Sequence, residues 1–488
     1  MYIDIRYHKW NKKDKNVLSK SCLKILNLKE IQFYQPYMSL YFHIHNTKNS
    51  HKMIDLKRRF YLKEIIEITD EKYHTSNMFL KGDIYDSHKS ISLQKEIFCK
   101  CITLLDPLNY IMNNYNIFVY RNNLLPSCYN YNTYHKINNM NNSAYIDTFL
   151  SSICSEITLN NLNPSFPIFY GSFNGIKKEF NFDISDDYAS IKKEFWFYKN
   201  MNQNDLSINM YESSSESESE SESESESESR SESSDNSNSN SEEDTNDYII
   251  ILKDIPCQFF FIEKLQGTLE DLLDDIEGLN TDIILSCIFQ VSFALIYMQK
   301  HYNFTHNDLH INNIMYISTE KTYLYYKFNN IYYKIPTFGY IFKIIDFGRS
   351  IFTFHKKTFF NDTFENHGEA EGQYTKPFNL LHFKDDKEEI SINYHFDLCR
   401  LAITILDVCG FDKNVNYKNK QDFVDFIYNM TLTKNGESLF NLEDDFNMYI
   451  LIAKYANNAL PRNIIQNIIF NQYRVKKKDF PKKLYYTL

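Results

Sequence analysis

The stretch NFTHNDLHINNIMYI, residues 303–317, groups several polar side chains inside a frame of apolar residues. Those that could take part in chemistry are His306, Asp308, His310 and Asn313. A carboxylate in such a loop can orient and deprotonate a hydroxyl group, or it can simply cap a turn. Whether Asp308 is catalytic therefore depends on what other residues accompany it.

A second acidic site follows at IIDFGRS, where Asp346 stands at the end of an expected strand. Phosphoryl transfer from ATP needs a carboxylate near the acceptor hydroxyl and oxygen ligands that hold Mg²⁺ against the phosphates. Asp308 suits the first role, and Asn313 together with Asp346 suits the second. The two stretches together predict a phosphotransferase that uses ATP and Mg²⁺.

The elements around these stretches are expected to bring them into one site. TDIILSCIFQVSFALIYMQKHY has apolar residues at helical spacing and predicts a long core helix directly before the loop. NIMYI and FKIIDF predict two short strands, separated by about two dozen Tyr-rich residues. TLEDLLDD and FDLCRLAITILDV predict further helices, so the part of the chain after Gly267 is expected to be mainly helical.

The upstream part of the chain is expected to be rich in strands. SLQKEIFCKCITLL, FPIFYGSF, KKEFNFDI and QFFFIEKL predict strands, and SAYIDTFLSSICSEITL predicts one main helix. The sequence thus predicts an α+β fold with a small strand-rich half and a larger helical half, joined near residues 263–267.

The charge of −10 is concentrated in one segment. Residues 212–247 hold fourteen acidic residues and one arginine, so the rest of the chain is close to neutral. Residues 212–246 alternate Ser and Glu with no apolar residue, which predicts a disordered acidic insert. No basic stripe indicates a nucleic-acid partner.

Hydrophobic residues make up 43% of the 488, enough for a substantial core. The nine cysteines include no C-x-x-C pair, which argues against a structural zinc site and favours a reducing, cytosol-like compartment. The first residues lack the apolar core of a signal peptide. The longest apolar run is interrupted by polar residues, so no membrane span is expected.

HNDLHINN and DFG resemble the catalytic loop and the magnesium-binding turn of the protein-kinase superfamily. Within it, THNDLHINNIMY, KIPTFGYIFKIIDFGRSI and NNSAYIDTFLSS are similar to serine/threonine kinases of giant DNA viruses. The resemblance covers roughly residues 81–488 and implies a bilobal fold. Residues 81–266 would be a β-rich N-lobe that carries the insert, and residues 267–488 a helical C-lobe. Residues 1–80 are left as an extension of unknown role.

The resemblance also implies an activity, which is transfer of phosphate from ATP to a Ser or Thr of a protein, in the host cytoplasm or the virion. A kinase strand carries a lysine that holds the α- and β-phosphates and pairs with an acid on the following helix. Lys100 is favoured for this lysine, with Lys136 as competitor. Glu156, about fourteen residues before YGSF, is favoured as its partner, with Asp147 as the alternative. Asp397 matches the aspartate that braces the catalytic loop.

Other positions match the kinase pattern only in part. Backbone groups at Glu263 and Leu265 would bind adenine. No G-x-G-x-x-G is present, and a turn around Gly82 is expected to cover the phosphates instead. Asn307 stands where kinases have arginine, which makes control by a phosphorylated activation loop less expected. His310 stands where kinases have lysine, and it either helps to neutralise the phosphoryl group or packs the loop.

Two other functions fit the same residues. HNDLH also looks like the loop of choline and aminoglycoside kinases, although an intact DFG favours a protein substrate. The missing glycines and the uncertain lysine would also fit a pseudokinase that acts as a scaffold or virion component. The oligomeric state is not indicated by the sequence.

Overall fold

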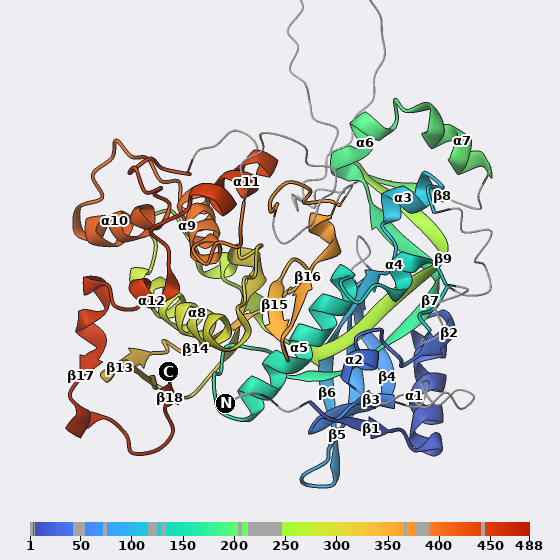
Figure 1. The fold of residues 1–488 in the computed structure, drawn as a ribbon, viewed down its shortest axis with the longest axis horizontal. Helices are drawn as coiled ribbons and strands as arrows, with labels where there is room; N and C mark the ends of the chain where they lie inside the picture. The colour runs from blue at the N-terminus through green and yellow to red at the C-terminus, as the bar shows by residue number, and fades with distance from the viewer. Residues whose placement is uncertain are drawn as a thin grey trace, which may run out of the picture.

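The protein has a mixed α+β fold, as predicted, in which a strand-rich part and a helical part lie side by side (Figure 1). The computed structural model describes residues 3, 5–41, 54–71, 76–115, 124–127, 133–203, 207–212, 246–365, 368–375, 390–440 and 445–488. The interior of the expected acidic insert, residues 213–245, lies outside these ranges.

The strand-rich part is built on a seven-stranded antiparallel sheet with the order β2-β7-β9-β6-β5-β4, to which β8 adds by pairing with β9. Burial alternates residue by residue along β5, as expected for a strand with one face on the core. The strands are β2 (Leu28–Gln32), β4 (Phe60–Glu71), β5 (Met78–Asp86), β6 (Ile91–Thr103), β7 (Phe169–Asp183), β8 (Ser207–Glu212) and β9 (Asn246–Glu263).

Residues 1–80 are not separate from this sheet, which corrects the boundary expected at residue 81. That boundary falls inside β5, and the preceding residues supply β2 and β4. They also form β1 (Tyr7–Lys9), which pairs with β3 (Ile54–Leu56), and two helices, α1 (Lys12–Ile25) and α2 (Met38–Tyr41). FPIFYGSF and KKEFNFDI, expected as two strands, form the single strand β7.

Helix α5 (Ser143–Leu159) is the predicted main helix of this part. It begins where the side chain of Asn142 accepts a hydrogen bond from the amide of Ala144 at 3.1 Å. It contacts β7 and β9 on one side, and on the other the rings of Phe149 and Phe359 lie 5.4 Å apart. It therefore lies between the sheet and the helical part (Figure 1). The shorter helices are α3 (Pro107–Ile111), α4 (His135–Asn138), α6 (Ser185–Ile191) and α7 (Phe195–Gln203).

Helix α8 (Thr281–Tyr302) is the core of the helical part. Its N-cap is Asn280, whose side chain accepts a hydrogen bond from the amide of Ile283 at 3.4 Å. It is long and apolar enough to cross a membrane, but 83% of its most apolar window is buried inside the protein. These are the surroundings of a core helix, in line with the expectation of no membrane span.

Short strands after α8 hold the two stretches that the sequence singled out. β11 (Ile314–Ser318) pairs with β10 (Gly267–Thr268) and with β14 (Tyr340–Ile344), as the spacing of NIMYI and FKIIDF predicts. The Tyr-rich residues between them form the hairpin of β12 (Tyr323–Phe328) and β13 (Ile331–Pro336). The remaining strands are β15 (Ile351–Phe354), β16 (Lys357–Phe360), β17 (Arg474–Val475) and β18 (Tyr486–Thr487).

The helix predicted for TLEDLLDD is only a 3₁₀ turn, Glu270–Leu272. Asp271 accepts a hydrogen bond from the amide of Thr268, and Asp275 accepts one from the amide of Gly278. These bonds to side chains compete with the backbone hydrogen bonds of a helix, which explains why no longer helix forms. FDLCRLAITILDV forms a helix as predicted. The helices of this region are α9 (Phe396–Val408), α10 (Gln421–Met430), α11 (Asp445–Tyr455) and α12 (Pro461–Ile464).

Candidate active site

Lys100 joins three elements of the fold. Its ammonium group, on β6, lies 2.7 Å from Oδ2 of Asp147 on α5 and 2.8 Å from Oδ1 of Asp346, which follows β14. The second oxygen of Asp147 accepts a hydrogen bond from the amide of Phe347 at 3.0 Å. The sheet, the main helix and the DFG stretch are therefore tied together at one point.

These contacts set the charge states of the cluster. Burial disfavours the charged form of Lys100, but Asp147 and Asp346 raise its pKa above the usual value for lysine. Partial burial would raise the pKa of Asp346, yet attraction to Lys100 lowers it below its usual value. The Asp346 side chain is 40% exposed, so its carboxylate is both ionised and open to a ligand.

Asp397, at the start of α9, holds the loop that carries Asp308. Its buried carboxylate accepts hydrogen bonds from the amides of His306, at 3.1 and 3.0 Å, and of Asn307, at 2.9 Å. The His306 ring contributes a second connection, with Nε2 2.9 Å from the carbonyl oxygen of Ile345. The Asp308 loop is thus bound to the segment that leads into Asp346.

Asn307 connects the loop to the chain after the DFG stretch. Its amide nitrogen donates to the carbonyl oxygen of Arg349 at 3.0 Å, and its amide oxygen accepts from the hydroxyl of Tyr374 at 2.6 Å. Asn307 has a φ of 64°, a left-handed conformation that asparagine adopts more readily than most residues. Neutral hydrogen bonds therefore position this segment where kinases use an arginine.

The carboxylate of Asp308 is half-buried and is bonded to a tyrosine from a distant helix. The hydroxyl of Tyr449, on α11, donates to Oδ1 of Asp308 at 2.6 Å. The guanidinium groups of Arg349 and Arg400 lie 5.4 and 5.1 Å from the centre of the Tyr449 ring. Sequence reasoning missed Tyr449 and Tyr374, because both reach the loop through tertiary packing and no local pattern marks them.

His310 orients Asn313. The Asn313 amide nitrogen donates to the carbonyl oxygen of Asp308 at 2.8 Å and lies 3.0 Å from Nε2 of His310. The other ring nitrogen, Nδ1, lies 3.3 Å from the amide nitrogen of Asn312. Burial lowers the pKa of His310, which favours the neutral ring. His310 therefore contacts Asn313 within the loop, and its role in neutralising a phosphoryl group stays a prediction.

A small cavity borders the lysine cluster. Its volume is about 190 Å³, and its lining includes Lys100, Asp346 and Phe347. Phe98 of β6 and Phe260 and Ile262 of β9 also belong to the lining. The Lys100 ammonium lies 5.9 Å from the centre of the Phe260 ring. Charged and apolar side chains therefore line the same small cavity.

The segment expected to bind adenine lies at the end of β9, next to this cavity but not in its lining. The Glu263 carboxylate accepts a hydrogen bond from the amide of Ile168 at 2.9 Å and lies 3.5 Å from the ammonium of Lys343. Leu265 is buried. The Glu263 amide donates to the carbonyl oxygen of Ile168 at 2.9 Å, so both the side chain and the N–H of Glu263 serve the structure.

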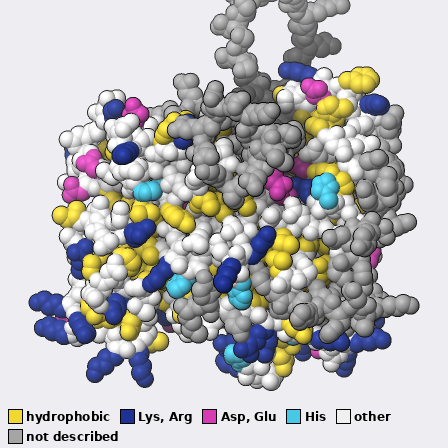
Figure 2. Space-filling view, in the orientation of Figure 1, with side chains coloured by type: hydrophobic (Ala, Val, Ile, Leu, Met, Phe, Trp, Pro, Cys, Tyr) yellow, Lys and Arg dark blue, Asp and Glu magenta, His cyan; other side chains and the backbone are white. Residues whose placement is uncertain are grey.

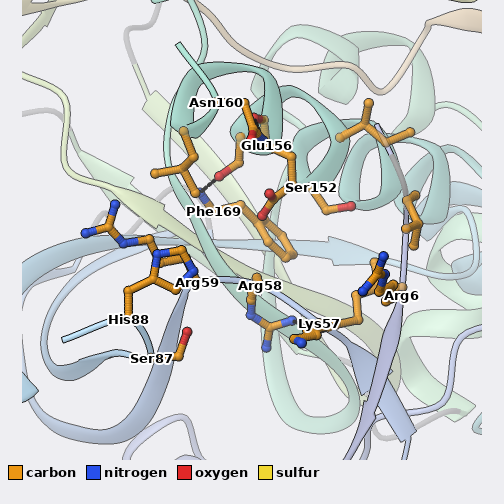
Figure 3. Close-up of a pocket in the computed structure, with 15 residues that line it drawn as sticks. Arg6, Lys57, Arg58, Arg59, Ser87, His88, Ser152, Glu156, Asn160 and Phe169 are labelled. Carbon is orange, nitrogen blue, oxygen red and sulfur yellow. Dashed lines mark hydrogen bonds between the residues drawn. The ribbon is translucent and has the colours of Figure 1, made fainter. Parts of the chain in front are cut away.

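Glu156 is not the partner of Lys100, which corrects the residue favoured from the sequence. Asp147 and Glu156 are nine residues apart on α5, which is about two and a half helical turns, so they project from opposite sides. Glu156 lines a different cavity (Figure 3). Asp147, the alternative, pairs with Lys100, and the competitor Lys136 pairs with Asp362 at 2.9 Å.

Gly82 is not in a turn, which corrects a second expectation. It lies within β5, opposite Ile65 on one side and Lys95 on the other. A Cβ atom at this position would lie 2.7 Å from Cδ1 of Leu62. The glycine allows close packing inside the sheet, and the connection between β4 and β5 falls at residues 72–77, of which residues 76 and 77 are described.

Comparison with known proteins gives one relationship without a function. No family model matches the chain. The chain is 24% identical over 223 residues to uncharacterized protein 098R of Invertebrate iridescent virus 6. The match covers 41% of this chain and 37% of the viral protein, so the chain spans well under half of that relative. The similarity suggests a viral origin.

Proposed function

We propose that this protein is a phosphotransferase with a protein-kinase-like bilobal fold, which transfers the γ-phosphate of ATP to a Ser or Thr hydroxyl of a protein. The observation that carries the proposal is the position of Lys100 between Asp147 and Asp346. The Asp308 loop is bonded to the residue before Asp346. These contacts support a site in which separate elements of the fold supply the groups that phosphoryl transfer requires.

Each residue has a role that follows from its contacts. Lys100, held by Asp147, would bind the α- and β-phosphates, and Asp308 would orient the acceptor hydroxyl and accept its proton. Backbone groups near Leu265 would bind adenine.

Asn313 and Asp346 fit the chemistry of a magnesium site. The hydrogen bonds of the Asn313 nitrogen direct its amide oxygen away from Asp308, and Asp346 presents a partly exposed, ionised carboxylate. Oxygen atoms of this kind are the ligands that Mg²⁺ prefers. When bound, Mg²⁺ would neutralise charge on the phosphates of ATP.

The arrangement of the two parts supports the bilobal assignment. The sheet with α5 would be the N-lobe, and the part built on α8 and α9 the C-lobe, with the end of β9 as the hinge (Figure 1). The intact DFG favours a protein over a small alcohol as substrate. We therefore rank the hypothesis of a choline- or aminoglycoside-type kinase below that of a protein kinase. The host cytoplasm or the virion is the proposed location.

A pseudokinase scaffold is the second candidate, and the cavity favours it. Its volume of about 190 Å³ is smaller than that of typical ligand pockets, about 300–1,000 Å³. The side chains of Phe98 and Phe260 are part of its lining. A nucleotide would need more room than this volume provides.

Substitution of Asp346 by Asn separates the two candidates. A kinase predicts Mg²⁺-dependent transfer of phosphate from ATP to protein serine in the wild type, and its loss in Asp346→Asn. Asp407→Asn, which removes an exposed carboxylate of α9, is the matched control and should leave transfer unchanged. Transfer that persists in Asp346→Asn would refute the assignment. Absence of both transfer and thermal stabilisation by Mg²⁺ and ATP would favour the scaffold.

A further inference from the structure

A second, larger cavity lies on the side of α5 opposite Lys100. Its volume is about 520 Å³, within the range of about 300–1,000 Å³ typical of ligand pockets. Figure 3 shows basic side chains along one wall and polar side chains of α5 along the other; the labelled ones are Arg6, Lys57, Arg58 and Arg59, and Ser152, Glu156 and Asn160. None of these groups has a role in the proposed phosphate transfer.

The two central guanidinium groups are held in fixed positions. Arg58 donates to both oxygens of Asp55, at 3.1 and 2.7 Å, and to the carbonyl oxygen of Tyr170 at 3.1 Å. Arg59 donates to both oxygens of Asp86, at 3.1 and 2.9 Å. Because these bonds order the arginines in advance, a ligand that binds them loses little side-chain entropy.

The cavity lining holds more basic than acidic side chains, although Asp55 and Asp86 pair with two of the arginines from outside it. It includes the side chains of Arg6, Lys57, Arg58, Arg59 and His88, and Glu156 is its one carboxylate among the described residues. Figure 2 shows Lys and Arg side chains along much of the lower edge of the molecule.

Glu156 is the acidic side chain of this lining and is partly exposed. No side chain in the described part of the chain forms an ion pair with its carboxylate. Burial raises the pKa of Glu156 above its usual value, and Arg58 offsets only part of the rise.

We propose that this cavity binds a phosphate monoester group. Such a group carries close to two negative charges and accepts several hydrogen bonds, which matches a wall of ordered guanidinium groups and a flexible ammonium. The Asn160 amide donates one hydrogen to the carbonyl oxygen of Glu156 at 2.7 Å, and its second hydrogen provides a further donor on the opposite wall. The same chemistry is present in a phosphoserine peptide and in a free phosphate compound, so the test must compare these sources.

The test measures binding by fluorescence anisotropy to a labelled Ser-Glu repeat peptide that contains one phosphoserine. The protein is the full chain with Asp346→Asn, so that binding does not depend on phosphate transfer. Lys57→Glu reverses an exposed charge of the lining and should weaken binding roughly tenfold. Glu156→Gln removes the one acid and should tighten it. Lys89→Glu, exposed on the neighbouring turn but outside the lining, is the matched control.

The competitors identify the source of the phosphate. Inorganic phosphate and pyrophosphate that displace the peptide at equal concentration would assign the site to a free phosphate compound, and much weaker competition would assign it to a phosphopeptide. Three results would overturn the proposal: no binding of any phosphate ligand, equal affinity for the unphosphorylated peptide, or the same change in Lys89→Glu as in Lys57→Glu. Because the variant protein cannot transfer phosphate under the proposed function, failure here leaves that function untouched.

Discussion

The hydroxyl of Tyr449 donates a hydrogen bond of 2.6 Å to Oδ1 of Asp308, from a helix 141 residues further along the chain. In the proposed reaction the acceptor hydroxyl needs a carboxylate oxygen of Asp308. In that reaction the Tyr449 hydroxyl would compete with the acceptor hydroxyl for this oxygen. Opening of this contact would precede the binding of a substrate.

Tyr449→Phe removes this bond and keeps the ring between Arg349 and Arg400. A hydrogen bond to a charged group contributes about 1.5–3 kcal/mol, so we expect peptide phosphorylation to become roughly tenfold faster. The measurement is kcat/KM with a peptide substrate. A fall in kcat/KM would instead mean that Tyr449 positions Asp308 for catalysis.

Asp147→Asn breaks the ion pair with Lys100 and leaves an amide oxygen for the Phe347 amide. Loss of one partner from a buried pair costs about 3–5 kcal/mol, so the free energy of unfolding in urea should fall by about 3 kcal/mol. Glu156→Gln, on the same helix, is the matched control, for which we expect less than about 1 kcal/mol. Equal losses in the two variants would contradict the assignment of Asp147 as the partner of Lys100.

Tyr374→Phe leaves the buried oxygen of Asn307 without its donor. An unsatisfied buried acceptor costs about 1–3 kcal/mol, which should appear in the free energy of unfolding. Tyr323→Phe is the control, since the Tyr323 side chain is 38% exposed. Equal free energies of unfolding in the two variants would show that the Tyr374 hydroxyl does not stabilise the loop of Asn307.

Stability should also depend on pH through His301. Burial lowers the pKa of this ring to about 4, from 6.5 in the unfolded chain. The unfolded state therefore binds more protons between these values, and stability should rise as the pH increases from 4 to 6.5. Thermal unfolding of wild type and His301→Gln over this range is the measurement. The stability of the variant should rise less steeply with pH than that of the wild type. Parallel curves of stability against pH would show that His301 does not cause the dependence.

Features set by local sequence were predicted well. The helices α5, α8 and α9 follow from apolar spacing, and the loop of Asp308 follows from the order of helix, loop and strand. The ion-pairing position of Lys100 also follows from an alternating strand, β6.

Features that depend on helical phase or on tertiary packing were not predictable in the same way. The number of residues between Glu156 and YGSF favoured Glu156 as the partner of Lys100. In the structure the face of α5 that carries Asp147 is the one turned toward Lys100. Gly82 was expected in a turn, because the sequence does not show that the Leu62 side chain packs against it. The contact of Tyr449 with Asp308 joins two segments that are 141 residues apart, so no local sequence pattern indicates it.

The most direct test of the central claim is the initial rate of ³²P transfer from γ-labelled ATP and Mg²⁺ to protein serine, in wild type and in Asp308→Asn. Removal of a general base typically slows a reaction by about 10²–10⁴-fold. We expect a wild-type rate well above background and a fall of at least about 100-fold in the variant, with the fold retained by thermal unfolding. Equal rates in the two proteins, or no transfer by the wild type, would contradict the claim.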